Sequence, residues 1–165
     1  MPTGYLVFPD TSALEALWMS DLLDRALCAR RTIVVLDAVV DFFAADRESR
    51  RSKDIKVFVS VNRPPFHVHA TEMGQVIRNL RRLGHEPKPN ALELASSDFM
   101  SDETGLAVYL AQGDPVTVVS DRTFAVFNAP PNLTFVSVES WIADLRNEAA
   151  CRDPAGGVVP GGAIP

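Results

Sequence analysis

The sequence lacks the features that mark several large classes of protein. Its longest apolar runs, residues 32–36 and 116–119, are far shorter than the roughly 20 residues that a membrane-spanning helix needs. The N-terminus has no basic segment leading an apolar one, so no secretion signal is expected. Two cysteines are too few for a disulfide framework or a thiolate zinc site. We therefore expect a soluble, cytoplasmic protein.

The sequence also lacks the motifs of common nucleotide-binding and hydrolytic sites. It has no GxGxxG loop, no P-loop and no GxSxG elbow, which leaves dinucleotide binding, P-loop chemistry and serine hydrolysis without support. Of the three histidines, His67 and His69 lie two apart on one side of an expected strand, and His85 stands alone. Two ligands from one strand do not make a metal site, and alternation on a half-buried strand is the simpler explanation.

Length and composition are those of one globular domain. The chain has 165 residues, 47% of them hydrophobic and 22% charged, which is ordinary for a single folded unit. The net charge of −5 is unevenly spread, because residues 47–88 carry ten Lys or Arg and four Asp or Glu, leaving −11 elsewhere. This basic stretch could attract a phosphate backbone, or it could form the solvated faces of two helices.

Short apolar runs alternate with helical patterns along the chain. Strands are expected at residues 5–9, 32–36, 66–70, 116–120 and 133–138. Helices are expected from 12 to 27, 37 to 43, 52 to 61, 71 to 83, 91 to about 112 with a break near 101–105 left open, and around 141–145. The alternation predicts an α/β domain with a mostly parallel sheet over residues 1–148. Residues 149–165, rich in Gly and Pro, are expected to form a flexible tail.

Acidic residues stand at the expected strand ends. Ser12 and Glu15 form a capping-box pattern that starts the first helix and leaves Asp10 at the end of its strand. Asp37 has the position of a helix cap, and Asp121 ends the strand at 116–120. Because ligands of open α/β sheets bind outside the carboxyl ends of the strands, we expect Asp10 and Asp121 to face one crevice.

Carboxylates gathered in one crevice indicate a metal-dependent reaction. Like charges resist ionisation together, and a hard divalent cation removes that cost. Mg²⁺ and Mn²⁺ prefer oxygen ligands and support displacement at a phosphodiester. Thr11 and Ser12 could orient Asp10 by hydrogen bonds. The pattern therefore predicts metal-dependent phosphoryl chemistry.

Three segments resemble the PIN-domain ribonucleases. Residues 8–14, FPDTSAL, look like the strand of that family that ends in Asp followed by Thr or Ser. Residues 119–124, VSDRTF, are similar to its late strand-Asp-x-x-Phe element, and residues 34–41, VVLDAVVD, run as a strand into a helix with an acid. The resemblance covers about residues 5–145. It implies a single PIN-like domain with a four- or five-stranded parallel sheet, Mg²⁺ or Mn²⁺, RNA cleavage, and often the toxin role in a toxin–antitoxin pair.

The resemblance also implies a set of site residues. Asp10 and Asp121 match the metal ligands, and Asp41, which precedes two phenylalanines, is the best match to the acid of the second helix, although a shift of one residue would place Phe42 there.

The third acid has two candidates. Asp102 stands 19 residues before Asp121, at the family spacing, and Glu93 lies in NALELA at 90–95, which looks like the Asn-Ala-Gly-Glu element of a PIN subgroup. Either acid could instead serve a helix start, Glu93 as a capping-box partner and Asp102 through the helix dipole. Glu103 is a weaker candidate.

These patterns predict a metal-dependent ribonuclease. The RNA backbone is expected on the basic stretch, at Arg50, Arg51, Arg81 and Arg82. Expected partners are RNA, an antitoxin protein and a second copy of the chain. One alternative is a non-catalytic PIN-like binding module, supported by the imperfect match at Asp41. The other is a haloacid-dehalogenase-like phosphatase, which needs a second Asp where Ser12 stands.

Overall fold

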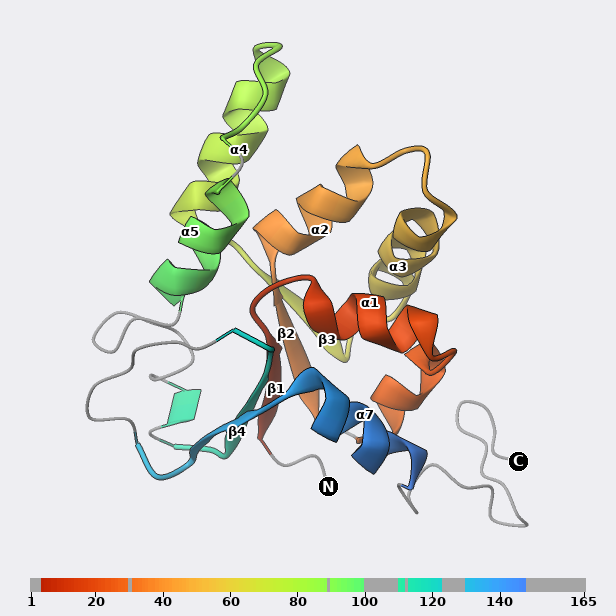
Figure 1. Cartoon of the computed structure of the whole chain (residues 1–165). Coiled ribbons are helices and arrows are strands. Elements are labelled where there is room, and N and C mark those ends of the chain that lie inside the picture. Colours follow the sequence, from red (N-terminus) through yellow and green to blue (C-terminus); the bar gives the residue numbers. More distant parts are fainter. Residues whose placement is uncertain are drawn as a thin grey trace.

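A five-stranded sheet with every neighbouring pair parallel forms the centre of the molecule (Figure 1). The computed structural model describes residues 4–29, 31–88, 90–99, 110–111, 113–122 and 130–147. The strand order is β3-β2-β1-β4-β5. The strands are β1 (Tyr5–Phe8), β2 (Thr32–Leu36), β3 (Phe66–His69), β4 (Val116–Val119) and β5 (Leu133–Val136). The predicted α/β class is confirmed, with all strands parallel.

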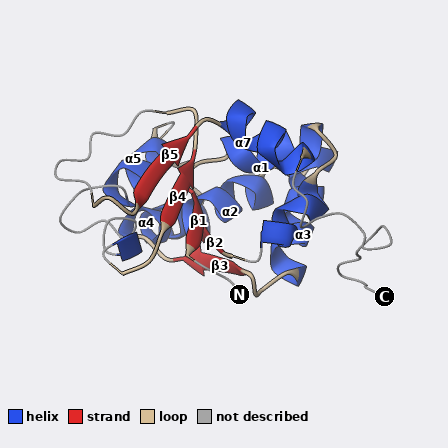
Figure 2. Ribbon diagram, turned by 90° about the horizontal axis from the view of Figure 1, so that it is seen from below, coloured by secondary structure: helices blue, strands red, loops and turns tan. Residues whose placement is uncertain are grey.

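Helices cover the sheet on both sides. They are α1 (Ser12–Met19), the 3₁₀ helix η1 (Leu23–Ala29), α2 (Asp37–Ala45), α3 (Arg50–Val61), α4 (Glu72–Arg82), α5 (Ala91–Phe99) and α7 (Val138–Arg146). Figure 2 shows α1, α3 and α7 on one side of the strands, and α4 and α5 toward the other. Helices on both faces explain why the central strands are continuous apolar runs rather than alternating ones.

The core is built on the central strand. Leu6, Val7 and Phe8 of β1 are all buried, because helices cover the side chains on both faces of the sheet. The ring of Phe8 meets Trp141 of α7 edge to face, with ring centres 5.2 Å apart. On the edge strand β3, Phe66 makes a similar contact with Phe58 of α3 at 5.6 Å. These contacts fix α7 and α3 on the same side of the sheet.

One predicted helix start, one N-cap and one helix length were wrong, although α1 does begin at Ser12 as expected. Helix α1 ends at Met19, and Asp21 follows with φ of +57° before η1 begins, so the pattern to Leu27 is not one helix. The N-cap of α1 is Thr11, which makes no side-chain cap bond. Helix α3 begins after Ser49, whose hydroxyl accepts the Ser52 N–H at 3.2 Å, rather than at Ser52 itself.

The start and end of α4 were predicted correctly. The Thr71 hydroxyl accepts the Gly74 N–H at 2.9 Å as the N-cap. Gly84 follows the helix with φ of +85°, and the His85 N–H reaches back to the Leu80 carbonyl at 2.8 Å. That bond is typical of a glycine-terminated helix.

Some sequence predictions lie outside the described residues. These are the segment after Phe99 with its break at 101–105, and the tail at 149–165 with the domain boundary at 148. Cys28 in η1 is disulfide-bonded, and Cys151, the other cysteine of the sequence, is also outside. Within the described part of the chain, every helix is too short or too polar to cross a membrane.

We expect the buried face of α1 to carry much of the stability. Leu17 is fully buried, whereas Met19, two residues on, is 69% exposed. Leu17→Ala should lower the free energy of unfolding by about 2–5 kcal/mol, because it removes apolar contacts and leaves a cavity. Met19→Ala should change it by less than about 0.5 kcal/mol. Urea denaturation of both variants measures this, and equal losses would contradict the packing described.

Candidate active site at the carboxyl edge of the sheet

Asp10 lies just beyond β1 and is held by three hydrogen bonds. Its Oδ1 accepts from the Ser12 N–H at 3.0 Å and the Ser12 hydroxyl at 2.6 Å. Its Oδ2 accepts from the Ser120 hydroxyl at 2.6 Å. Asp10 is only 8% exposed, and every one of these donors is neutral. Thr11, by contrast, donates to Glu15 at 3.3 Å.

Ser120 was missed by the sequence analysis. It directly follows β4 and is buried, and its hydroxyl accepts the Arg122 N–H at 3.0 Å while donating to Asp10. The same strand-end rule that selected Asp121 could have selected Ser120, because β4 lies beside β1 in the sheet.

Asp121 holds the start of α7. Its Oδ1 accepts the Val138 N–H at 3.1 Å, and Val138 is the first residue of that helix. The side chain lies at the surface. An acid at this position therefore satisfies a helix N–H group that has no partner within the helix.

Asp37 is a strand-end acid to which the sequence analysis gave only the role of a helix cap. It was expected to cap α2, but Leu36 is the N-cap and makes no side-chain bond. The Asp37 carboxylate instead accepts from the Thr71 hydroxyl at 2.8 Å and the Thr71 N–H at 3.2 Å. Arg78 donates to it at 2.8 Å. The signal that could have found it is its place directly after β2.

Gly74 allows α4 to approach this carboxylate. A Cβ atom built on Gly74 would lie 2.2 Å from both carboxylate oxygens of Asp37, closer than any non-bonded contact allows. Only glycine leaves room for Asp37 at this point. The first turn of α4 and the first residue of α2 are therefore in direct contact.

Asp41, the predicted second acid, shares the same arginine. Nη1 of Arg78 lies 3.2 Å from its Oδ2. Burial raises the pKa of the Asp41 carboxyl above its ordinary value, and the positive charge of Arg78 partly opposes that rise. The hydrogen bond to Asp37 in turn raises the pKa of Arg78. One guanidinium thus serves two carboxylates.

Of the two main candidates for the third acid, only Glu93 lies within the described residues. Glu93 lies in the first turn of α5 and its side chain is exposed. Asp102 and Glu103 lie outside the described residues. Among the residues that are described, no three His, Cys, Asp or Glu side chains come together as potential metal ligands. The choice between Glu93 and Asp102 stays a prediction.

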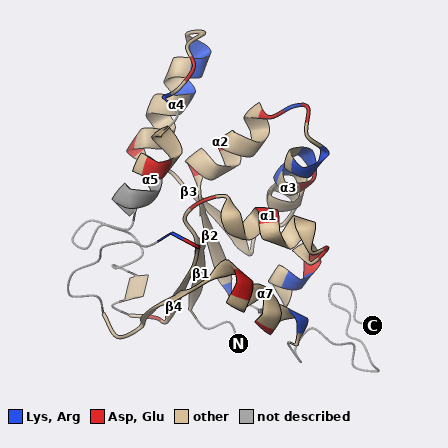
Figure 3. Cartoon of the chain, in the orientation of Figure 1, with Lys and Arg blue, Asp and Glu red and all other residues tan. Residues whose placement is uncertain are grey.

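Most of the Lys and Arg residues of 47–88 fall into two groups rather than one stretch. Figure 3 shows these groups on α3 and toward the end of α4, and α2 packs between these helices. Arg50 and Arg51 pair with Asp54 at 3.8 Å and Glu15 at 3.6 Å.

The α4 group faces a cleft. Arg81 donates to the Asp41 carbonyl at 3.3 Å and Arg82 to Asn79 at 2.8 Å. Arg81 lines a cleft of about 530 Å³ with Asp41, Arg47 and Arg78.

Comparison with known proteins leaves the family open. No protein-family model matches the sequence, and no curated protein matches it. Among solved structures, a chain of VapBC2 from Rickettsia felis, in its complex with a DNA fragment from the promoter, is similar at a TM-score of 0.36 and 13% identity, over 81% of this chain and 98% of that one. A likeness of this size carries no argument about function.

The shared guanidinium predicts a stability difference between two arginines of α4. Arg78→Met leaves the buried Asp37 without a cation, and we expect a loss of about 1–3 kcal/mol in unfolding free energy, the lower end reflecting the partial exposure of Arg78. Arg82→Met, which removes a hydrogen bond to Asn79 of the same helix, should be nearly neutral. Chemical denaturation distinguishes the two. Equal stabilities would show that Asp37 does not depend on Arg78.

Proposed function

We propose that this protein is a metal-dependent ribonuclease whose site lies at the carboxyl edge of the sheet, around Asp10. One contrast carries the proposal. Asp10 and Asp37 are almost equally buried, at 8% and 6% exposure, yet Asp37 has Arg78 as a counter-charge while Asp10 has only neutral donors among the described residues. Burying a charge without an opposite charge is costly. A bound cation would offset that cost.

The donors around Asp10 fit Mg²⁺ or Mn²⁺. Both ions prefer oxygen ligands, and Mg²⁺ keeps several waters while binding through one or two carboxylates. Asp10 and Asp121 follow the adjacent strands β1 and β4 and are the proposed ligands. Either Glu93 or Asp102 is proposed as the third acid. Asp41, which lies beside Arg78, completes the proposed set of acids.

Hydrogen bonding leaves a defined part of Asp10 for a ligand. A carboxylate has about four acceptor positions. Oδ1 already accepts two bonds and Oδ2 one, so Oδ2 retains the capacity to accept another partner. Ser12 and Ser120 fix the carboxylate plane from two sides. A divalent ion bound there would activate water and stabilise charge on phosphodiester oxygens.

The substrate we propose is single-stranded RNA held through its phosphates. Arg81 and Arg82 on α4 are the proposed backbone contacts nearest the cleft, with Arg50 and Arg51 on α3 as a second group. Phosphate contacts give affinity without sequence information, so discrimination by this chain alone should be limited. An antitoxin partner remains a proposal from the sequence resemblance. A second copy of the chain and a cytoplasmic location remain proposals from the sequence.

One observation favours the non-catalytic alternative. Arg78 occupies both Asp37 and Asp41, so two acids near this edge already have a cation. A site that relies on Asp10 and Asp121 alone could bind a ligand without cleaving it. Metal binding and RNA cleavage therefore have to be measured separately.

The first test is metal binding. Mn²⁺ should raise the melting temperature of the full chain, because an ion that binds only the folded state stabilises it by mass action. Asp10→Asn should abolish this rise, since the amide removes the charge that binds the ion. Asp144→Asn, an exposed acid of α7, is the matched control and should keep it. An undiminished rise in Asp10→Asn would remove Asp10 from the ligand set.

The second test is cleavage of a labelled single-stranded RNA. We expect Mn²⁺ or Mg²⁺ to support cleavage and EDTA, Asp10→Asn and Asp121→Asn to stop it. Glu93→Gln and Asp102→Asn identify the third acid by which of them lowers the rate. The Arg81→Ala/Arg82→Ala double variant should weaken RNA binding, which falls steeply as salt rises, and should keep the Mn²⁺ melting shift. Tight Mn²⁺ binding with no cleavage of any RNA would favour the binding module.

A further inference from the structure

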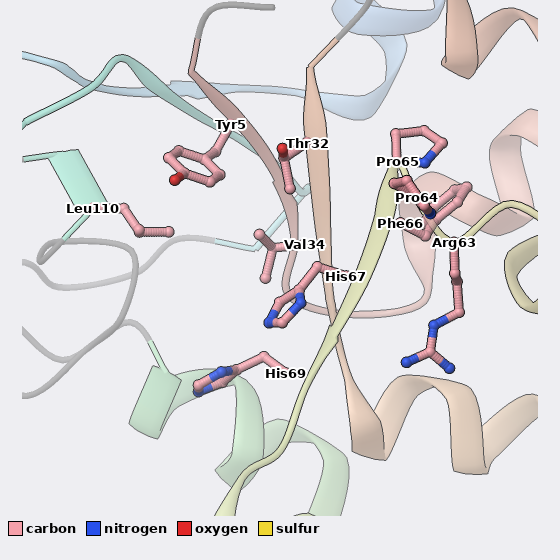
Figure 4. A pocket seen from close by; sticks show the side chains of 10 residues that line it. All are labelled: Tyr5, Thr32, Val34, Arg63, Pro64, Pro65, Phe66, His67, His69 and Leu110. Atoms are coloured by element: carbon pink, nitrogen blue, oxygen red, sulfur yellow. The ribbon is translucent and has the colours of Figure 1, made fainter.

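The two histidines of β3 share a pocket on the face of the sheet away from α3. Phe66 and His67 alternate along the strand, and Phe66 packs on Phe58 of α3, so His67 and His69 point to the opposite side. There they line a pocket of about 700 Å³ (Figure 4). Figure 4 shows both rings on the same side of β3 as Tyr5 and Thr32, while Arg63 extends to the other side.

The two rings lie near the separation that one common metal ion requires. Their centres are 6.5 Å apart, and their planes are tilted by 40°. With metal–nitrogen bonds of about 2.0–2.1 Å, two imidazoles on one tetrahedral ion have ring centres about 5–6 Å apart. His67 lies at the surface of an edge strand, so a small side-chain rotation would close this difference.

We propose that His67 and His69 form a two-histidine site for a divalent transition-metal ion that prefers imidazole, such as Zn²⁺ or Ni²⁺. The site is chemically distinct from the carboxylates around Asp10, because imidazole nitrogen suits Zn²⁺, Ni²⁺ and Cu²⁺ while carboxylate oxygen suits Mg²⁺ and Mn²⁺. Because two ligands from one strand do not complete a metal site, water or a small ligand in the pocket would fill the remaining coordination positions. Tyr5 and Thr32 line the same pocket.

The pKa of His69 agrees with this geometry. Burial lowers the pKa of His69, and the neighbouring His67 lowers it further, against a smaller opposing effect of Asp37. A neutral imidazole is the form that binds a metal. The alternation on a half-buried strand, which accounts for the sequence pattern, is therefore compatible with a ligand pair.

The test is a calorimetric titration of Zn²⁺ into the full chain, prepared without a histidine tag and stripped with EDTA. His67→Ala and His69→Ala should each weaken binding roughly 10²-fold, because losing one of two linked ligands removes the advantage of simultaneous binding. His85→Ala, which removes an exposed histidine after α4, is the matched control and should bind as the unaltered chain does. Asp10→Asn should also bind Zn²⁺ normally, which separates this site from the proposed ribonuclease site.

Two outcomes of the calorimetric titration would overturn the proposal. One is unchanged Zn²⁺ affinity in both His67→Ala and His69→Ala, and the other is loss of Zn²⁺ binding in Asp10→Asn alone. If either alanine variant loses its circular dichroism signal, His67→Gln and His69→Gln replace it, since glutamine keeps side-chain volume. Ring signals of His67 and His69 in NMR spectra should shift on Zn²⁺ addition while those of His85 stay, and the reverse pattern would also contradict the assignment.

Discussion

The acids that follow the strands accept hydrogen bonds from backbone N–H groups at helix starts. The arrangement of the carboxyl edge of the sheet depends on these bonds. Asp10 accepts the N–H of Ser12, the first residue of α1. Asp121 accepts that of Val138, the first residue of α7. Asp37 accepts that of Thr71, the N-cap of α4. A carboxylate is well placed there because the helix dipole favours negative charge at its N-terminus.

This role in binding helix N–H groups changes how an acid at a strand end should be interpreted. Each of the three carboxylates has a structural task, so its position alone does not separate a catalytic acid from a structural one. The surroundings do separate them. Asp37 has Thr71, Arg78 and the close backbone of Gly74 around it, whereas Asp10 has two serine hydroxyls and a backbone N–H. Counter-charge, more than burial, distinguishes the candidate site from a structural ion pair.

The sequence predicted elements better than contacts. Strand positions followed from short β-branched runs such as 32–36, and the Thr71 cap and Gly84 stop followed from local chemistry. The Ser12–Glu15 capping box does not form, because the Ser12 hydroxyl donates to Asp10 instead. Local sequence patterns do not account for such a competing partner. Arg78 could not have been foreseen, since its bond to Asp37 joins residues 41 apart, and a basic helix face gives no sign of which cation turns inward. The shared pocket of His67 and His69 likewise needed the neighbouring strands.

The bond between Ser120 and Asp10 has a consequence for the order in which the molecule forms. It joins residues 110 apart in the chain, and β1 lies in the sheet between β2, which follows early, and β4, which follows late. Closing so long a loop carries an entropic cost that local contacts do not. During synthesis, β1 and β2 can pair long before residue 120 leaves the ribosome. Asp10 therefore acquires its last hydrogen-bond donor only when most of the chain has been made, so an incomplete chain carries an incomplete site.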